Sequence, residues 1–386
     1  MSSARGQQGQ KRRERSFFDF TLLSVVIFLL CFGLVMLYSV SSYDANLNYN
    51  DSSYFLRKQI ISTVFGLVVM TVVIFIDYHI WSRFAFAAYV VSAVLIFLVL
   101  TPLGYEVNGA RRWLNLGMSL QPAEVAKVGV IIFYASLVCK LGKNLMTKAG
   151  FAVIIPTAGF MALIILVITE NLSSSIIVFG IVFMMLFVAS DNYREFILLA
   201  AGGILIAAVV VILVQKGILS SDLNFRFARI EAWLNPEAFA ADRGFQTLQA
   251  LYAIGSGEVF GKGLGQSMQK LGYIPEAQND MIFSIICEEL GLFGAAVVML
   301  MFIIMIWRFV IIANNAEDEF GALIVVGVMS HIAIQVILNI AVVTNTIPNT
   351  GITLPFISYG GSAVVFLLIE IGLVLSVARS IKLKNS

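Results

Sequence analysis

Long apolar runs recur along the chain and constrain its fold more than any other feature. Each is close to the roughly 20 residues that a helix needs to cross a membrane. Hydrophobic residues make up 59% of the chain and charged residues only 12%, less than half of what soluble domains carry. Strand-type alternation is weak, which excludes a membrane barrel. We therefore predict an all-α polytopic membrane protein with about ten transmembrane helices, in the runs 17–40, 59–76, 84–101, 123–139, 151–169, 172–189, 195–214, 281–312, 320–343 and 361–378.

The basic residues between these runs predict the orientation. Residues 1–16 form a basic tail, and basic residues of the short loops fall on the same side of the membrane as this tail, as the positive-inside rule requires. We therefore expect both termini in the cytoplasm, with 17–379 as a single transmembrane domain and 380–386 as a C-terminal tail. The long connection 215–280, between the seventh and eighth spans, is then extracytoplasmic.

Cysteine, histidine and overall charge exclude several classes of site. Cys31, Cys139 and Cys287 lie in apolar segments, so neither a disulfide nor a metal site is indicated. His79 and His331 are isolated, which disfavours zinc and favours a core or interface role for each. The net charge is only +2, which gives no argument for a nucleic-acid partner.

Acidic residues at the start of the eighth run are the leading candidates for a functional site. Asp280 ends a polar stretch, and Glu288 and Glu289 follow inside the apolar run. Ionisable groups in a membrane segment are costly and usually functional. Asp280 also suits a helix N-cap, but a cap does not need the glycine-rich, basic loop before it, so we favour function. Asp280 and Glu288 would stand about 12 Å apart in one helix, too far for a carboxylate pair that flanks one bond, so a single base with cations fits better.

A basic and aromatic cluster follows the third run. Arg111, Arg112 and Trp113 stand side by side in the stretch 108–117. Guanidinium groups bind phosphate bidentately, and Trp favours the headgroup level of a membrane. The same residues also suit an anchor to anionic lipid headgroups. Both interpretations stay open from this motif alone.

The fourth run opens with an acid and a base on one helical face. Glu124 and Lys127 are three residues apart, and Pro122 suits the first turn of a helix. An ion pair inside a membrane segment must face protein or water. The pair is either a structural bridge between helices or part of an active site, and Lys127 would weaken Glu124 as a base.

The long loop and a later non-helical stretch supply further polar candidates. Gln249, Lys262 and Lys270 precede Asp280, and the glycines around Lys262 suit either a phosphate cradle or tight turns, although their spacing fails the nucleotide fingerprints. Residues 349–362 contain Ser358 and are rich in proline and glycine. Non-helical backbone at membrane depth must be buried in protein or line a cavity. We expect such a cavity to open toward Asp280.

With these motifs together, the membrane portion resembles the SEDS family of bacterial cell-wall glycosyltransferases, and its FtsW branch more than its RodA branch. The matching motifs are Asn108–Trp113, Gln121–Lys127, Ala253–Gly265, Gln269–Gly291 and Thr350–Ser362. The resemblance implies a ten-span helical fold, Asp280 as the essential acid, and functional roles for Glu124, Lys127 and Arg112. One departure is the stretch 171–175, Asn-Leu-Ser-Ser-Ser, where many members have Pro-Asp-Leu-Gly-Thr.

The resemblance also implies an activity, partners and a location. The implied activity is polymerisation of lipid II into glycan strands at the outer face of the bacterial cytoplasmic membrane, at the division septum. The implied partners are a class B penicillin-binding protein, other division membrane proteins and membrane lipid. No cofactor is certain, although Mg²⁺ or Mn²⁺ is a candidate for offsetting charge on the leaving pyrophosphate. The alternatives are a flippase or other transporter of the same lipid, and a non-catalytic scaffold for the partner synthase.

Overall fold

The structure is a computed structural model that describes residues 18–381, apart from 108, 116–118, 146, 191, 220–224 and 243. Ten of its helices are long and apolar enough to cross a membrane, as predicted. They are α1 (Phe20–Tyr49), α2 (Tyr54–Phe75), α3 (His79–Leu98), α4 (Pro122–Leu141), α5 (Lys148–Ile168), α6 (Leu172–Ala189), α7 (Tyr193–Gln215), α10 (Ile282–Asn315), α11 (Glu319–Val343) and α12 (Gly361–Ser380). The predicted basic tail, 1–16, and most of the C-terminal tail lie outside the described residues.

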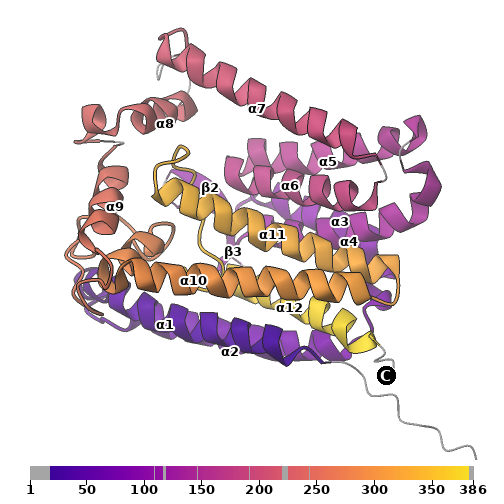
Figure 1. Cartoon of the computed structure of the whole chain (residues 1–386), viewed down its shortest axis with the longest axis horizontal. Helices are drawn as coiled ribbons and strands as arrows, with labels where there is room; N and C mark the ends of the chain where they lie inside the picture. The colour runs from indigo at the N-terminus through magenta and orange to yellow at the C-terminus, as the bar shows by residue number, and fades with distance from the viewer. Residues whose placement is uncertain are drawn as a thin grey trace, which may run out of the picture.

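Smaller elements lie between these helices. A three-stranded antiparallel sheet follows α3, in the order β1 (Gly104–Val107), β2 (Ala110–Asn115) and β3 (Ser119–Leu120). The connection from α7 to α10 holds α8 (Phe225–Leu234), the 3₁₀ turn η2 (Pro236–Phe239) and α9 (Phe245–Ser256), and a further 3₁₀ turn, η1 (Gly142–Asn144), follows α4. The sheet, α8 and α9 gather at one end of the long helices, which we call the site end (Figure 1).

The sheet is a feature that the sequence did not predict. Its strands are too short for alternation to stand out, and side-chain bonds help to hold the first two together. The Arg111 guanidinium donates to the carbonyl oxygens of Thr101 and Gly104, at 2.8 Å each. Tyr105 lies opposite Trp113 across the two strands. Arg111, Arg112 and Trp113 therefore lie on a strand of a short hairpin at the site end and not in an irregular loop.

The helices pack around α4, α11 and α12, which are the most deeply buried of the ten. Helix α11 contacts α4, α6 and α10, while α12 packs along α2. Small residues bring some of these helices into close contact, as is common between membrane helices. A β-carbon at Gly327 of α11, for example, would lie 2.8 Å from the Ile131 side chain of α4. The core is thus a tight helical layer on which the site end is built.

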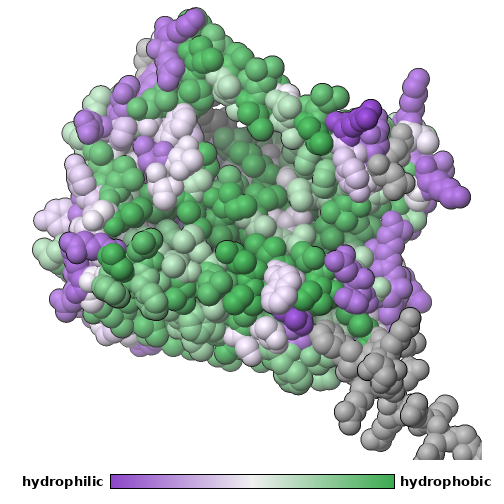
Figure 2. Space-filling model, viewed as in Figure 1, coloured by the Kyte–Doolittle hydropathy of each residue, from purple (hydrophilic) through white to green (hydrophobic). Residues whose placement is uncertain are grey.

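Helix α7 contrasts with this core. Only Phe196 and Val214 are buried among its described residues. The helix lies apart from α5 and α6 at the edge of the molecule (Figure 1), and Figure 2 shows the surface hollowed beneath it. Figure 2 also shows an apolar surface across the middle of the molecule, with hydrophilic residues toward the two ends of the helices, as expected for a protein that spans a membrane.

Helix α1 is longer than the predicted run 17–40. Asp19 starts it by accepting a bond from the Leu22 amide at 2.9 Å, and Asn50 ends it in the left-handed conformation. Asp19 also pairs with Arg308 of α10 at 2.7 Å. This ion pair ties α1 to α10 at the end of the bundle opposite the site end.

Helix α10 is broken near its start. Gly291 has φ 66° and ψ −166°, a backbone region that is essentially restricted to glycine. The break lets the preceding loop bond directly to the helix backbone: the Leu292 amide donates to the Glu258 carbonyl, and the Lys262 amide donates to the Glu288 carbonyl, both at 2.9 Å. The loop is therefore fixed onto the first turns of α10.

Glycines on the loop side make this contact close. A β-carbon at Gly257 would lie 1.9 Å from the Cys287 carbonyl oxygen, and one at Gly261 would lie 2.2 Å from the Glu289 carbonyl oxygen. Two backbones therefore meet without side chains between them. The positive φ of Gly261, 76°, agrees with the tight-turn interpretation of this glycine run, and the phosphate cradle stays a prediction.

We predict that Gly291→Ala destabilises the protein by about 1–3 kcal/mol, because alanine is strained in this backbone region and its β-carbon would lie 2.4 Å from the Gly261 nitrogen. Thermal unfolding of the purified protein in detergent measures the loss. Gly202→Ala is the matched control, since a β-carbon there meets nothing within 4 Å and Gly202 lies within a helix. Equal melting temperatures for the two variants would contradict the prediction.

Candidate active site

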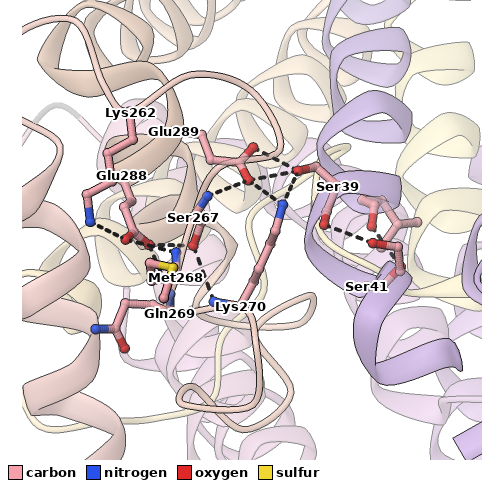
Figure 3. A network of polar contacts seen from close by, with 11 residues as sticks. Ser39, Ser41, Lys262, Ser267, Met268, Gln269, Lys270, Glu288 and Glu289 are labelled. Atoms are coloured by element: carbon pink, nitrogen blue, oxygen red, sulfur yellow. Dashed lines mark hydrogen bonds and ion pairs between the residues drawn. The ribbon is translucent and has the colours of Figure 1, made fainter. Parts of the chain in front are cut away.

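The acids Glu288 and Glu289 lie fully buried in the first turns of α10 and are both ion-paired (Figure 3). Glu288 pairs with Lys262 at 2.7 Å, and Glu289 pairs with Lys270 at 2.8 Å. The Ser267 hydroxyl also donates to Glu288. Each buried carboxylate therefore has a compensating cation from the loop, as burial of charge requires.

A contact with α1 completes this network. The Ser39 hydroxyl donates to Glu289 at 2.8 Å, and Lys270 Nζ donates to Ser39 at 3.0 Å. The loop, α10 and α1 are thus joined through one polar cluster (Figure 3). Lys262 and Lys270 were predicted to bind substrate; their pairing favours a structural role, and contact with substrate stays a prediction.

Asp280 lies just before α10, at the site end. The Asn339 side-chain amide of α11 donates to the Asp280 carbonyl at 2.8 Å and to the Ile352 carbonyl at 2.6 Å. A β-carbon at Gly351 would lie 3.9 Å from Asp280 Oδ2. The non-helical stretch before α12 therefore lies against Asp280, and the cavity expected to open there stays a prediction. The cap of α10 is Met281, which makes no side-chain cap bond, so the N-cap alternative for Asp280 is not supported.

The electrostatic environment of Asp280 suits a proton acceptor. Its side chain is partly exposed, yet desolvation by the surrounding protein raises its pKa to about 6. The charge of Glu276 also raises this pKa, whereas the charge of Arg229 lowers it. Asp280 makes no ion pair within the described residues, in contrast to Glu288 and Glu289. A carboxylate with a pKa near neutrality is matched to general base catalysis.

Arg112 faces the same region. Its Nε donates to the Thr169 carbonyl at 3.1 Å, which ties β2 to the end of α5. Burial lowers its pKa, and the positive charge of Arg229 lowers it further, while Glu170 opposes the shift. Arg229 thus acts electrostatically on both Asp280 and Arg112, and we refer to these three residues as the charged group. Arg229 was not selected as a site residue from the sequence.

The remaining substrate-binding candidates are dispersed. Arg111 binds carbonyl oxygens of the hairpin, and Ser358 is buried, where its oxygen accepts a bond from the Leu354 amide at 2.8 Å. Trp113 on β2 and Gln249 on α9 are both partly exposed. The structure gives Arg111 and Ser358 structural roles, and substrate contact by any of these residues stays a prediction.

Glu124 and Lys127 form the predicted ion pair, 2.8 Å apart at the start of α4. Both are buried, and Lys127 Nζ also donates to the Gln335 side-chain oxygen of α11 at 3.4 Å. The bond from α4 to α11 agrees with the structural interpretation. A direct part in chemistry stays a prediction.

The departure at 171–175 has a structural role here. Asn171 caps α6 through a bond from the Ser174 amide at 3.0 Å, and the Ser173 hydroxyl donates to the Thr350 carbonyl. Ser173 therefore ties the start of α6 to the non-helical stretch that lies against Asp280. Among the described residues, no group of three or more His, Cys, Asp or Glu side chains could hold a metal ion.

Fold and site together define a polytopic membrane protein with a charged site at one end of its helical bundle. The chain belongs to the cell cycle protein family that groups FtsW, RodA and SpoVE, whose family model matches residues 20–383. It is 38% identical to stage V sporulation protein E of Bacillus subtilis over 366 residues, which cover 94% of this chain and 97% of that protein. The resemblance stated from the motifs is thus confirmed.

Two further comparisons agree. The chain is 38% identical to a probable peptidoglycan glycosyltransferase FtsW of Trichlorobacter lovleyi over 369 residues, which cover 95% of this chain and 94% of that protein. A solved chain from a peptidoglycan synthase complex that coordinates polymerization and crosslinking superposes with a TM-score of 0.77 at 25% identity, over 94% of this chain and 98% of that one. Both cover nearly the whole chain, so the likeness extends across the bundle and the site end.

We predict that Lys270→Met destabilises the protein by about 3–5 kcal/mol, because it leaves the fully buried Glu289 carboxylate without a cation. The double change Lys270→Met with Glu289→Gln is expected to regain much of that loss. Unfolding of both variants in the same detergent measures the difference. A fully stable Lys270→Met protein that has lost activity would instead move Lys270 into substrate binding.

Proposed function

We propose that this protein is a peptidoglycan glycosyltransferase that polymerises lipid II, with Asp280 as its general base. The observation that carries the proposal is the position of Asp280 at the site end, just before α10, where Asn339 holds its carbonyl and no ion pair within the described residues neutralises it. Burial raises its pKa to about 6, and the charge of Arg229 acts on it. The names of the relatives supply the substrate class. A carboxylate with a pKa near neutrality in the field of a guanidinium group suits transfer of a sugar from a pyrophosphate carrier.

The proposed reaction is a single displacement with inversion. The acceptor hydroxyl oxygen forms a bond to the anomeric carbon of the donor sugar, and its proton passes to Asp280. The bond from that carbon to the pyrophosphate oxygen breaks, and the electron pair leaves with the pyrophosphate. Arg112 and Arg229 offset the negative charge that develops there, and their planar groups suit bidentate contact with phosphate oxygens.

The cellular setting is part of the same proposal. The solved relative belongs to a peptidoglycan synthase complex, which supports a class B penicillin-binding protein as partner. We further propose that both termini are cytoplasmic, that residues 215–280 and the site end face outward, and that the protein acts at the septum with other division proteins. Polymerisation of labelled lipid II by the purified protein, with moenomycin present to silence contaminating enzymes, tests the activity directly.

We predict that Asp280→Asn lowers polymerisation by about 100- to 10,000-fold, the usual loss when a general base is removed. The wild-type value of kcat/KM should rise with pH to about 6 and then level off, because the base acts only when deprotonated and its pKa is raised to about 6. Initial rates across a pH series measure this rise of kcat/KM with pH. Near-normal synthesis by a folded Asp280→Asn protein would end the catalytic assignment and favour a scaffold or transporter.

We predict that Arg112→Lys also lowers polymerisation markedly, because lysine keeps the charge and loses the planar fork. If Arg112 only anchors the sheet to anionic headgroups, lysine should serve nearly as well, since that attraction is about 1 kcal/mol per cation of either type. The assay uses neutral detergent, so that bulk lipid charge does not contribute. Arg83→Lys on the exposed surface of α3 is the matched control, and equal turnover by the two variants would defeat the pyrophosphate role.

A further inference from the structure

A second polar group lies inside the bundle and is not part of the charged group at Asp280. His331 and Gln335 of α11 and Glu370 of α12 are 1%, 3% and 0% exposed. His331 Nδ1 lies 2.7 Å from Glu370 Oε2, and His331 Nε2 lies 2.8 Å from Gln335 Oε1. Through the bond from Lys127 to Gln335, this group continues into the Glu124–Lys127 pair.

The hydrogen-bond partners of His331 limit its protonation to two states. The Gln335 side-chain nitrogen donates to the Thr353 carbonyl at 3.0 Å, so its oxygen is the atom that faces the imidazole, and His331 donates to it from Nε2. Glu370 presents a carboxyl oxygen to the other ring nitrogen. The proton between them lies either on the ring, which makes an imidazolium and a carboxylate, or on Glu370, which leaves both groups neutral.

The group is electrically balanced in pairs. Glu124 is paired with Lys127, and Glu370 is paired with His331, which carries a positive charge when the shared proton lies on the ring. Glu370 Oε1 is buried and accepts no hydrogen bond within the described residues, so His331 is the one partner of this carboxyl group there. Four ionisable groups inside membrane helices are costly even when they are paired, which makes a role beyond packing the default expectation.

The group is connected to the Asp280 region through Gln335. Thr353, which accepts the Gln335 bond, belongs to the non-helical stretch that lies against Asp280. One turn further along α11, Asn339 holds the Asp280 carbonyl. The orientation of the Gln335 amide therefore sets both the position of this stretch and the oxygen that Lys127 contacts.

We propose that His331 and Glu370 are positioning residues for glycosyl transfer: their intramembrane ion pair orients Gln335, which places Lys127 and the stretch around Thr353 beside Asp280. The proposal rests on the proposed function, because its catalytic readout is lipid II polymerisation. Its electrostatic part is tested without activity.

The electrostatic test uses the two histidines of the chain, His79 and His331. Protein labelled with ¹⁵N-histidine in detergent gives signals that distinguish a charged ring from a neutral one, and a His79→Gln sample assigns them. The expected result is a charged His331 at neutral pH that becomes neutral in Glu370→Gln. A neutral His331 in the wild-type protein would overturn the ion pair that the proposal places here, whatever the activity.

The catalytic test removes the pair without leaving a buried charge. His331→Met with Glu370→Leu is expected to fold, since apolar replacement of a buried pair is often neutral for stability, and to lower kcat about tenfold. Glu370→Gln alone should retain most activity, because a neutral His331 still donates to Gln335 while accepting from the new amide. Removal of the remote Asp19–Arg308 pair, by Asp19→Asn with Arg308→Met, is the matched control and should leave kcat per folded molecule unchanged.

Gln335→Leu keeps the His331–Glu370 pair and removes its connection to Lys127 and Thr353. It is therefore the test variant if the double variant does not fold. It is expected to lower kcat to a similar extent, and combining it with the double variant should add little. Wild-type kcat in the double variant, or fully additive losses in the combination, would show that the pair acts only in packing. Absence of polymerisation by the wild-type protein would refute the proposed function, while the ¹⁵N measurement would still report on the pair.

Discussion

The attachment of the 257–270 loop to the first turns of α10 is the constraint on which the site depends. Glu288 and Glu289 are fully buried, and a buried carboxylate without a cation costs several kcal/mol. Their lysine partners come from the loop, so both charges are compensated only when the loop lies on the helix. The glycine break in α10 makes that approach possible, and the loop then leads directly into Asp280. A structural requirement of the helix thus fixes where the proposed base stands.

Compensation of charge separates structural acids from the candidate base. Glu124, Glu288, Glu289 and Glu370 each lie within 2.8 Å of a basic side chain. Asp280 has no such partner within the described residues, and it is the carboxylate whose pKa the surrounding protein raises to about 6. Arg229 acts on it at longer range and leaves its oxygens available. An acid that is held by its backbone and is not neutralised by an ion pair suits reversible proton transfer.

The sequence was sufficient for the ten helices and for the place of Asp280 just before α10, because apolar length and an acid at the edge of an apolar run are local signals. It was not sufficient for the partners of the buried glutamates. Lys262 lies 26 residues from Glu288, and Ser39 lies 250 residues from Glu289, so no spacing rule connects either pair. The short sheet was missed for a related reason, since its register depends on side-chain bonds such as those of Arg111.

Helix α11 joins the inner polar group to the site end through residues that share one face. His331, Gln335 and Asn339 are spaced four apart, which places them in a row about 12 Å long. Beyond the end of α11, the Asn345 carbonyl accepts a bond from the Trp233 indole of α8 at 2.9 Å. Helix α8 also carries Arg229, a member of the charged group. In the sequence these are polar residues on an apolar helix, but their partners lie on α4 and α12 and near α8, which come from distant parts of the chain. One helix therefore sets the position of the proposed base and of a cation beside it, and a displacement of α11 would change both together.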